Sequence, residues 1–319
     1  MTARFGPGVR RAAAEAVQGA TGVLVVADRA VLGLHGVPLD APAYALDGGE
    51  ACKTLDVWRG VLDACVERRL DRDAVIVAVG GGSVLDVAGF AAAAYLRGVR
   101  WVAVPTTLLA MVDAAHGGKT GVDHPAAKNL VGAFHAPSHV LCDPEYLGTL
   151  PEREVRGGLA EVVKHGVIGA PGLLARAGRD DPAGFVEEAA RVKLDIVARD
   201  PFEKGERRLL NLGHTLGHAL ERASGYALHH GEAVAVGLRA ACRIAEGHCG
   251  FRDAAVVEGA LDRCGLPRTA AVDPEAVRAA LLHDKKRSGA RLRWVLPVAL
   301  GDVRIFDDVG NTVPGSIFS

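Results

Sequence analysis

The sequence has no apolar run long enough to cross a membrane and no excess of charge of either sign. Its longest such run, residues 74–85, is about half of the roughly 20 residues that a spanning helix needs and is rich in glycine, so it predicts a buried strand that enters a turn. The 319 residues include 37 Lys or Arg and 38 Asp or Glu. This balance gives no reason to expect binding to nucleic acid or to a membrane.

A secretion signal and a cysteine framework are also missing. Residues 1–17 include basic side chains but no apolar segment with a small-residue cleavage site behind them. The six cysteines are scattered without a Cys-x-x-Cys pair, and no internal repeat is visible. We therefore expect a reduced, cytoplasmic protein.

The chain contains two successive patterns. Up to residue 149, short apolar runs alternate with amphipathic segments, which predicts an α/β nucleotide-binding domain with a mostly parallel sheet. Its expected strands are 23–27, 75–79 and 99–104, and its expected helices are 54–69 and 83–96. Over residues 150–319 nearly every segment has helical periodicity, which predicts a mainly α-helical domain for metal and substrate. Its expected helices are 152–167, 183–198, 209–224, 232–247, 252–264 and 274–283, with a surface excursion at 169–182.

A glycine-rich turn at residues 80–83 follows an expected strand and precedes a helix that carries Asp86. Bare backbone amides at a helix N-terminus can bind a phosphate, and a tight turn that needs positive φ is the alternative. The pattern is not Gly-x-Gly-x-x-Gly, so an ordinary dinucleotide fingerprint is not indicated. Thr106 and Thr107 end the next expected strand, where open α/β sheets bind ligands. Glu50 and Lys53 could contact the ribose of a nucleotide, and the alternative is that this pair is a solvated helix start.

Histidines at helical spacing suggest a metal centre in the second half. His214 and His218 are four residues apart, so they project from one face of a helix, and His230 heads the next one. Glu161 and Lys164 share a face of an earlier helix. Such ligands suit a catalytic Zn²⁺ or a similar divalent ion. The sequence has no His-Glu-x-x-His motif, so a zinc protease is not indicated. The alternative is that each histidine is a satisfied polar group.

Polar and cationic side chains form a third group. They are Lys119, Lys128 and Asn129 in the glycine-rich stretch 117–132, and Lys164, Lys193, Arg207 and the pair Lys285-Lys286 further along. In a chain of nearly neutral net charge, this concentration around candidate metal ligands suggests a small anionic substrate with phosphate and carboxylate groups. The alternative is that each lysine lies on a solvated surface.

Together these motifs resemble the sugar-phosphate cyclases, and most closely the 3-dehydroquinate synthase family. The matching segments run in family order through most of the chain and include 80–86 (GGGSVLD), 105–109 (PTTLL), 117–121 (GGKTG), 158–164 (GLAEVVK), 210–218 (LNLGHTLGH) and 230–232 (HGE). The resemblance implies a two-domain fold, bound NAD, a divalent metal such as Zn or Co, and a homodimer. It also implies conversion of 3-deoxy-arabino-heptulosonate 7-phosphate to 3-dehydroquinate, in which NAD⁺ takes and returns a hydride and phosphate leaves.

The resemblance assigns roles residue by residue. The metal ligands would be Glu161, His214 and His230. The residues that bind NAD⁺ would be Asp28, Glu50, Lys53, Gly81, Gly82, Asp86, Thr106 and Thr107. The catalytic residues would be Asp113, Lys119, Lys164, Lys193, Arg207, Asn211 and His218. Further substrate contacts would come from Arg97, Lys128, Asn129, Lys285 and Lys286, with Arg97 reaching the neighbouring subunit.

Three features depart from the family pattern. Asp123 stands where Asn is usual, His116 stands where a small apolar residue is usual, and we expect the chain to open on a helix before Val23 without the usual strand pair. The first two departures lie beside the proposed substrate loop and leave the exact substrate open. Three other functions also stay open. They are a secondary-metabolism cyclase acting on the amino analogue or on sedoheptulose 7-phosphate, a metal-dependent alcohol or glycerol dehydrogenase, and a non-catalytic nucleotide-binding relative.

Overall fold

The computed structural model describes residues 1–178, 180–288, 292–310 and 313–318, without the side chains of 283–288. The chain divides into two compact units, Met1–Pro151 and Glu152–Ser319, and each is described by itself. Among the described residues, no helix combines the length and the apolar character needed to cross a membrane.

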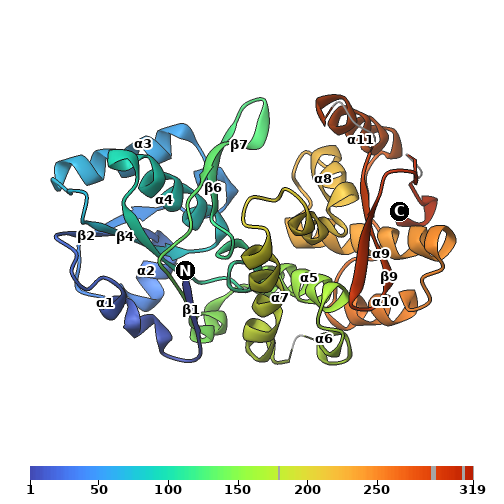
Figure 1. The fold of residues 1–319 in the computed structure, drawn as a ribbon, viewed down its shortest axis with the longest axis horizontal. Helices are drawn as coiled ribbons and strands as arrows, with labels where there is room; N and C mark the ends of the chain where they lie inside the picture. Colours follow the sequence, from blue (N-terminus) through green and yellow to red (C-terminus); the bar gives the residue numbers. More distant parts are fainter. Residues whose placement is uncertain (179, 289–291, 311–312, 319) are drawn as a thin grey trace. The chain divides into compact units, whose positions relative to one another are not determined.

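A six-stranded sheet forms the centre of the first unit (Figure 1). The strand order is β1-β8-β5-β4-β2-β3, and every pairing is parallel. The strands are β1 (Thr2–Phe5), β2 (Val23–Asp28), β3 (Ala43–Leu46), β4 (Val75–Gly80), β5 (Arg100–Pro105) and β8 (His139–Cys142). Every residue of β4 is buried, as expected of a central strand whose sheet is covered on both faces. The predicted α/β class of this unit is confirmed.

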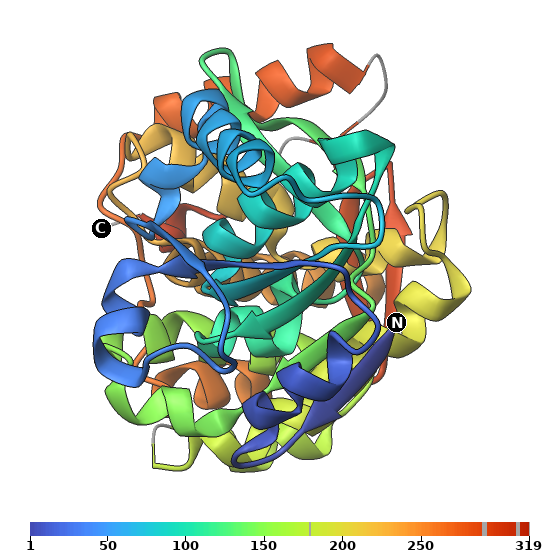
Figure 2. The ribbon, with the colours of Figure 1, turned by 90° about the vertical axis from the view of Figure 1, so that its left-hand side faces the viewer.

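Helices cover both faces of this sheet, with α3 and α4 on one side and α1 and α2 on the other (Figure 2). They are α1 (Ala13–Ala16), α2 (Arg29–His35), α3 (Leu55–Glu67) and α4 (Gly82–Ala94). Single helical turns connect the elements at η1 (Val9–Ala12), η2 (Glu50–Cys52), η3 (Tyr95–Arg97), η4 (Ala110–Ala114) and η5 (Pro144–Thr149). A separate antiparallel hairpin joins β6 (Lys119–His124) to β7 (Ala127–Phe134).

The expectation that the chain opens on a helix is wrong, because β1 precedes that helix and pairs with β8. The buried Asp143 carboxylate fastens the segment after β1 by accepting hydrogen bonds from the backbone N–H groups of Gly8 (3.1 Å) and Arg10 (3.3 Å). A four-residue edge strand is too short to give a periodic signal. β3 and β8 are also only four residues long, and neither was predicted.

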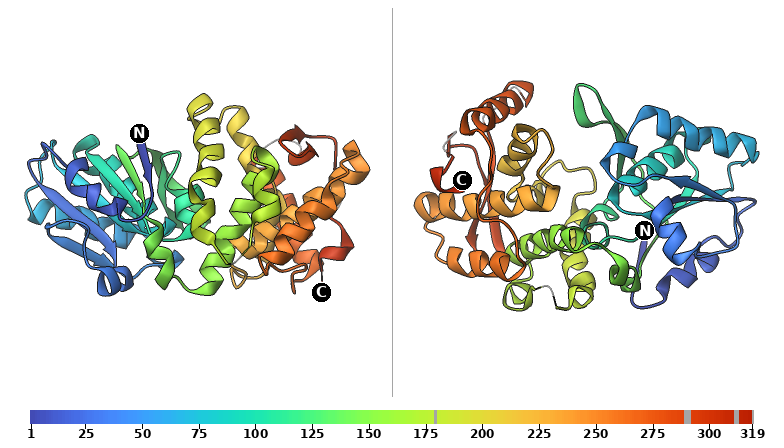
Figure 3. Two further views of the ribbon diagram at one scale, coloured as in Figure 1. Left: turned by 90° about the horizontal axis from the view of Figure 1, so that it is seen from below. Right: turned by 180° about the vertical axis from the view of Figure 1, so that it is seen from behind.

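The second unit is built mainly from helices, as predicted (Figure 3). They are α5 (Glu152–Ile168), α6 (Gly172–Arg176), α7 (Val186–Arg199), α8 (His214–Ala223), α9 (His230–Cys249), α10 (Ala254–Arg263) and α11 (Pro274–Ser288), with short turns η6 (Pro182–Phe185), η7 (Glu206–Asn211) and η8 (Gly315–Ile317). Helix α9 packs against both α5 and α8. The expected surface excursion at 169–182 is wrong in part, because Leu173 and Leu174 of α6 are buried.

Two further expectations for this unit need correction. An antiparallel hairpin, β9 (Trp294–Ala299) and β10 (Asp302–Phe306), follows the helices, although no strand was expected there. The single expected helix 209–224 is divided into η7 and α8, because Gly213 adopts a φ of 79° and ends the first turn before the second helix begins. Helix α8 therefore starts at His214.

Candidate metal centre and nucleotide-binding edge

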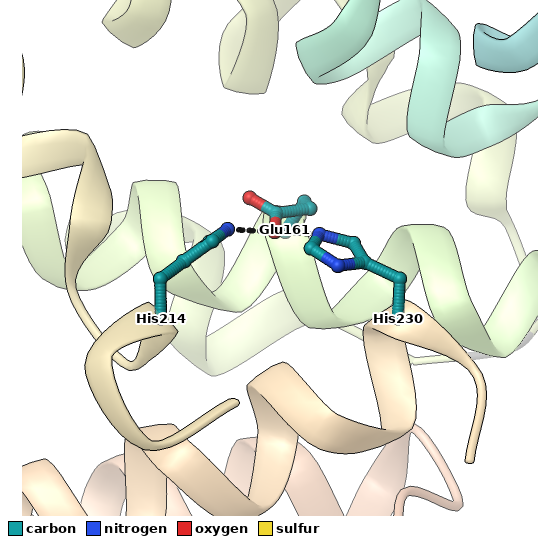
Figure 4. A group of neighbouring side chains, drawn as sticks. All are labelled: Glu161, His214 and His230. Atoms are coloured by element: carbon teal, nitrogen blue, oxygen red, sulfur yellow. Dashed lines mark ion pairs between the residues drawn. The ribbon is translucent and has the colours of Figure 1, made fainter. Parts of the chain in front are cut away.

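Glu161, His214 and His230 come together in the second unit (Figure 4). Glu161 lies in the middle of α5, whereas His214 and His230 are the first residues of α8 and α9. One ligand atom from each lies within 4.8 Å of the others, and both histidine Nε2 atoms are 3.6 Å from Oε1 of Glu161. Two atoms bonded to one Zn²⁺ at about 2.1 Å in tetrahedral geometry are roughly 3.4 Å apart. The three side chains therefore fit a divalent ion.

Close backbone contacts bring the three helices to this distance. A Cβ atom on Gly231 would lie 2.2 Å from the carbonyl oxygen of Gly157, so α9 approaches α5 one residue after His230. A Cβ atom on Gly237 would lie 2.0 Å from the carbonyl oxygen of Gly213, so α9 also approaches the start of α8. Only glycine permits either approach. The glycines on α9 therefore set the spacing of the three candidate metal ligands.

A second layer of contacts orients the two histidine rings. Nδ1 of His214 donates to the carbonyl of Leu212 at 3.1 Å, which leaves the lone pair of Nε2 facing Glu161. Nδ1 of His230 donates to Oε1 of Glu221 at 2.8 Å, which turns Nε2 of His230 toward Glu161. The resemblance did not point to Glu221, although it lies three residues after His218 on α8 and so shares a face with it.

The charges around the cluster favour a cation at its centre. Burial lowers the pKa of His214 well below its ordinary value, so His214 is neutral and able to bind metal. Burial also opposes charge on His230, but its hydrogen bonds to Glu161 and Glu221 outweigh that effect and raise its pKa to about 10. The buried ammonium of Lys164 contacts Glu161 as well. Two carboxylates thus stabilise positive charge here, whether it is a proton or a metal ion.

A cavity of about 260 Å³ opens beside His214 within the second unit. Its lining includes three predicted residues, Asn211, His214 and His218. The other lining residues are Arg208, Thr215, Arg293, Val295 and Ile305. The rings of His214 and His218 are 5.3 Å apart between centroids.

The remaining predicted residues of this unit lie elsewhere. Arg207 is only 2% exposed and its guanidinium donates to the carbonyl of Pro201. Lys193 is buried on α7, and neither it nor Arg207 lines the cavity. Lys285 and Lys286 fall on the part of α11 whose side chains lie outside the described residues.

In the first unit, the predicted NAD⁺ residues gather at the carboxyl ends of the parallel strands. Gly81 is the N-cap of α4, and a Cβ atom there would lie 3.1 Å from Cγ2 of Thr107, so the turn after β4 runs close to the end of β5. Thr106 is buried beside it. At the end of β2, Asp28 caps α2 by accepting a hydrogen bond from the Ala30 N–H at 2.8 Å. The amides that open α4 are therefore a candidate phosphate-binding element.

A charged network lies at the start of α4. Nζ of Lys53, which is 4% exposed, is 2.8 Å from Oδ2 of Asp86 and also contacts Oδ1 of Asn129. Lys128 pairs with Glu50 at 3.1 Å. Burial opposes the charge of Lys53, but Asp86 and Glu50 outweigh it and raise the pKa of Lys53. Residues assigned to NAD⁺ and to substrate thus form one network, and Lys53 is not a solvated helix start.

Asp123 ties this network to the β6–β7 hairpin. Its carboxylate accepts the N–H of Asn129 at 2.7 Å, and its own N–H donates to the carbonyl of Lys53 at 2.8 Å. Asn129 has a φ of 52°, an uncommon backbone conformation that these contacts hold in place. Asp123 was singled out from the sequence only as a departure from the family pattern.

Four other residues noted from the sequence are spread over the first unit. Asp113 is half-buried on η4, and Lys119 opens β6 with an exposed side chain. Arg97 is exposed on η3, where it and Leu96 both have positive φ. His116 is buried, and its Nε2 lies 2.8 Å from the carbonyl oxygen of Met111.

Comparisons with known proteins agree with this geometry. The model "3-dehydroquinate synthase N-terminal" matches residues 43–157, and "3-dehydroquinate synthase C-terminal" matches residues 158–287. A 3-dehydroquinate synthase of Symbiobacterium thermophilum is 48% identical over 277 residues, which are 82% of this chain and 77% of that protein. One from Nostoc punctiforme is 44% identical over 303 residues, 90% of this chain and 84% of that protein.

Solved structures with the same fold carry the expected ligands. A 2-epi-5-epi-valiolone synthase from Streptomyces hygroscopicus with NAD⁺ and Zn²⁺ bound has a TM-score of 0.87 at 28% identity, covering 97% of this chain and 93% of that one. A 2-deoxy-scyllo-inosose synthase complexed with carbaglucose-6-phosphate, NAD⁺ and Co²⁺ has a TM-score of 0.85 at 27% identity, covering 98% and 93%.

Proposed function

Because the chain belongs to the 3-dehydroquinate synthase family, we propose that it converts 3-deoxy-arabino-heptulosonate 7-phosphate to 3-dehydroquinate and phosphate with catalytic NAD and a divalent metal. The observation that carries the proposal is the Glu161–His214–His230 cluster beside a cationic cavity. The choice of substrate rests on relatedness, because the 3-dehydroquinate synthases compared are 43–49% identical to this chain, whereas two cyclases that make other products are 27–28% identical.

We assign NAD⁺ to the first unit and the metal to the second. The opening of α4 and the Lys53 network would hold NAD⁺, and Glu161, His214 and His230 would hold zinc or cobalt. When bound, NAD⁺ accepts and returns a hydride while the metal polarises a substrate oxygen.

The protein's own side chains would bind the substrate and move protons. Lys164 is buried against Glu161, and His218 faces the cavity, so both are suited to proton transfer near the metal. Lys119, Lys193 and Arg207 would bind anionic groups of the substrate, with Asp113, Asn129 and Asn211 completing the site. The pair Lys285-Lys286 and, in a homodimer, Arg97 of the neighbouring subunit would add further positive charge.

A cytoplasmic location is consistent with the cysteines. All six thiols are free and five are buried, an arrangement that suits a reducing compartment. Size-exclusion chromatography with light scattering would test the homodimer, and an Arg97→Ala variant should keep the oligomeric state while losing activity.

The test follows phosphate release and NADH absorbance together in purified protein supplied with NAD⁺, Zn²⁺ or Co²⁺ and the heptulosonate phosphate. Phosphate should appear without net NADH. Glu161→Gln should abolish turnover by weakening metal binding, whereas Glu152→Gln, an exposed position on the same helix, should not. Turnover only with the amino analogue or sedoheptulose 7-phosphate would replace the substrate, and net NADH from a simple polyol would refute cyclase chemistry.

A further inference from the structure

The cavity beside His214 contains two arginines that the family motifs do not assign. Arg208 comes from η7, and Arg293 immediately precedes β9. They share the lining with the metal ligand His214 and with His218. A single small cavity thus contains a metal ligand and two permanently charged groups.

The helical phase of η7 explains why Arg208 faces the cavity and Arg207 does not. In a 3₁₀-helix successive side chains are about 120° apart, and residues i and i+3 are eclipsed. Arg208 and Asn211 are such a pair, and both line the cavity. Arg207 points elsewhere, where its N–H donates to Asp200 at 3.1 Å and its guanidinium donates to the carbonyl of Pro201. The guanidinium of Arg207 therefore lies outside this cavity.

Arg293 is held at the cavity by a contact with α8. The hydroxyl of Thr215, the residue after His214, donates to the carbonyl of Arg293 at 3.1 Å. This bond ties the start of β9 to the first turn of α8. Arg293 is exposed, and Arg208 is half-buried.

The described lining of the cavity is rich in cationic residues. It includes two arginines and two histidines, and none of the described lining residues is a carboxylate. In the part of the chain that the structure describes, neither Arg208 nor Arg293 makes an ion pair, whereas Arg153, Arg239 and Arg243 each have a carboxylate partner within 3.1 Å. Arginine stays charged at all physiological pH values and binds carboxylate and phosphate through two parallel N–H donors. The natural complement of this cavity is an anion.

We propose that Arg208 and Arg293 form an anion subsite that binds the carboxylate or the phosphate of the substrate while its other end faces the metal-ligating residues. The inference rests on the proposed function and adds two substrate-binding residues to it. A volume of about 260 Å³ lies just below the roughly 300–1,000 Å³ of small-molecule pockets, so the cavity suits one end of a small substrate.

The test compares Arg208→Gln, Arg293→Gln and the double variant with Arg304→Gln, which removes an exposed arginine of the adjacent hairpin that pairs with Asp302. Melting temperature and Zn²⁺ affinity should stay unchanged in all four. Each cavity variant should raise the KM for the heptulosonate phosphate about ten- to a hundredfold, because hydrogen bonds to charged groups are lost. The kcat should fall less, and Arg304→Gln should match the wild type.

Calorimetric titration of the Zn²⁺-loaded, full-length protein with inorganic phosphate and, separately, with lactate identifies the group and does not require turnover. Loss of phosphate binding in the double variant assigns the subsite to phosphate, and loss of lactate binding assigns it to carboxylate. Wild-type levels of binding for both anions, with an unchanged KM, would overturn the proposal. If the wild type binds either anion through these arginines but turns nothing over, the subsite stands and the proposed reaction fails. If it binds neither, the subsite is refuted.

Discussion

Replacing Gly231 by alanine should separate α9 from α5 and disable the metal centre. The new Cβ atom would lie 2.2 Å from the carbonyl oxygen of Gly157 and 2.3 Å from its Cα, and both are backbone atoms that no rotamer change can move. An ordinary contact needs about 3.4 Å, so the two helices must part by roughly 1.2 Å. Overpacking of this kind costs roughly 1–3 kcal/mol.

The effect on the metal follows from the position of Gly231 next to His230. A 1.2 Å shift there would widen the 3.6 Å separation between Nε2 of His230 and Oε1 of Glu161 toward about 4.8 Å. Two bonds of about 2.1 Å to one ion can span at most roughly 4.2 Å. One ligand would therefore be lost, and Zn²⁺ affinity should fall at least about 100-fold, the upper end of the effect of losing an outer-shell partner.

Competition with a chromophoric chelator would measure Zn²⁺ affinity, and a thermal melt would measure stability. Gly157→Ala is the matched control, because it lies on the same helix pair and its Cβ atom would meet nothing within 4 Å. Since alanine is favoured over glycine inside a helix by roughly 1 kcal/mol, this control should bind Zn²⁺ normally and melt no lower than the wild type. Wild-type Zn²⁺ affinity in Gly231→Ala would refute the argument that backbone contact sets the ligand spacing.

Three further predictions concern other parts of the site. Glu221→Gln should weaken Zn²⁺ binding roughly 10–100-fold in the same assay, because the charged acceptor that orients His230 is lost. Asp123→Ala should weaken NAD⁺ binding roughly tenfold in a fluorescence titration, since the Asn129 N–H loses its acceptor, and Asp123→Asn should restore most of it. Only Cys249 among the six cysteines is not buried, so a disulfide reagent should label at most one thiol before unfolding.

The parts of the fold that were predictable are those whose pattern depends on the segment alone. The apolar run of β4 and the amphipathic α3 appear within two residues of their expected ends, because a central strand and a half-exposed helix have distinct periodicities. The edge strand β1 owes its position to pairing with β8, and β9–β10 has an apolar run too short to separate strand from helix. Partners distant in sequence decide those elements.

The candidate site also has a part that the sequence predicts and a part that it does not. Spacing of four residues places His214 and His218 on one face of α8 whatever surrounds it, but no spacing relates either residue to Glu161 on α5. The assignment of Glu161, His214 and His230 as one set of ligands came only from family resemblance. Likewise, the sequence offers two adjacent arginines, and only the phase of η7 selects Arg208 for the cavity.

The glycines of α9 link the packing of the helices to the geometry of the candidate metal site. Gly231 and Gly237 are six residues apart on one helix, yet they touch different partners, Gly157 on α5 and Gly213 before α8. Each partner lies within four residues of a metal-ligating position, Glu161 or His214. Glycines on α9 therefore set the distance from α9 to both α5 and α8, and the geometry of the candidate metal site depends on residues that have no side chain. It follows that substitutions at these glycines should impair metal binding more than substitutions of larger buried residues in the same helix, such as Leu238→Ala, which leave the backbone approach unchanged.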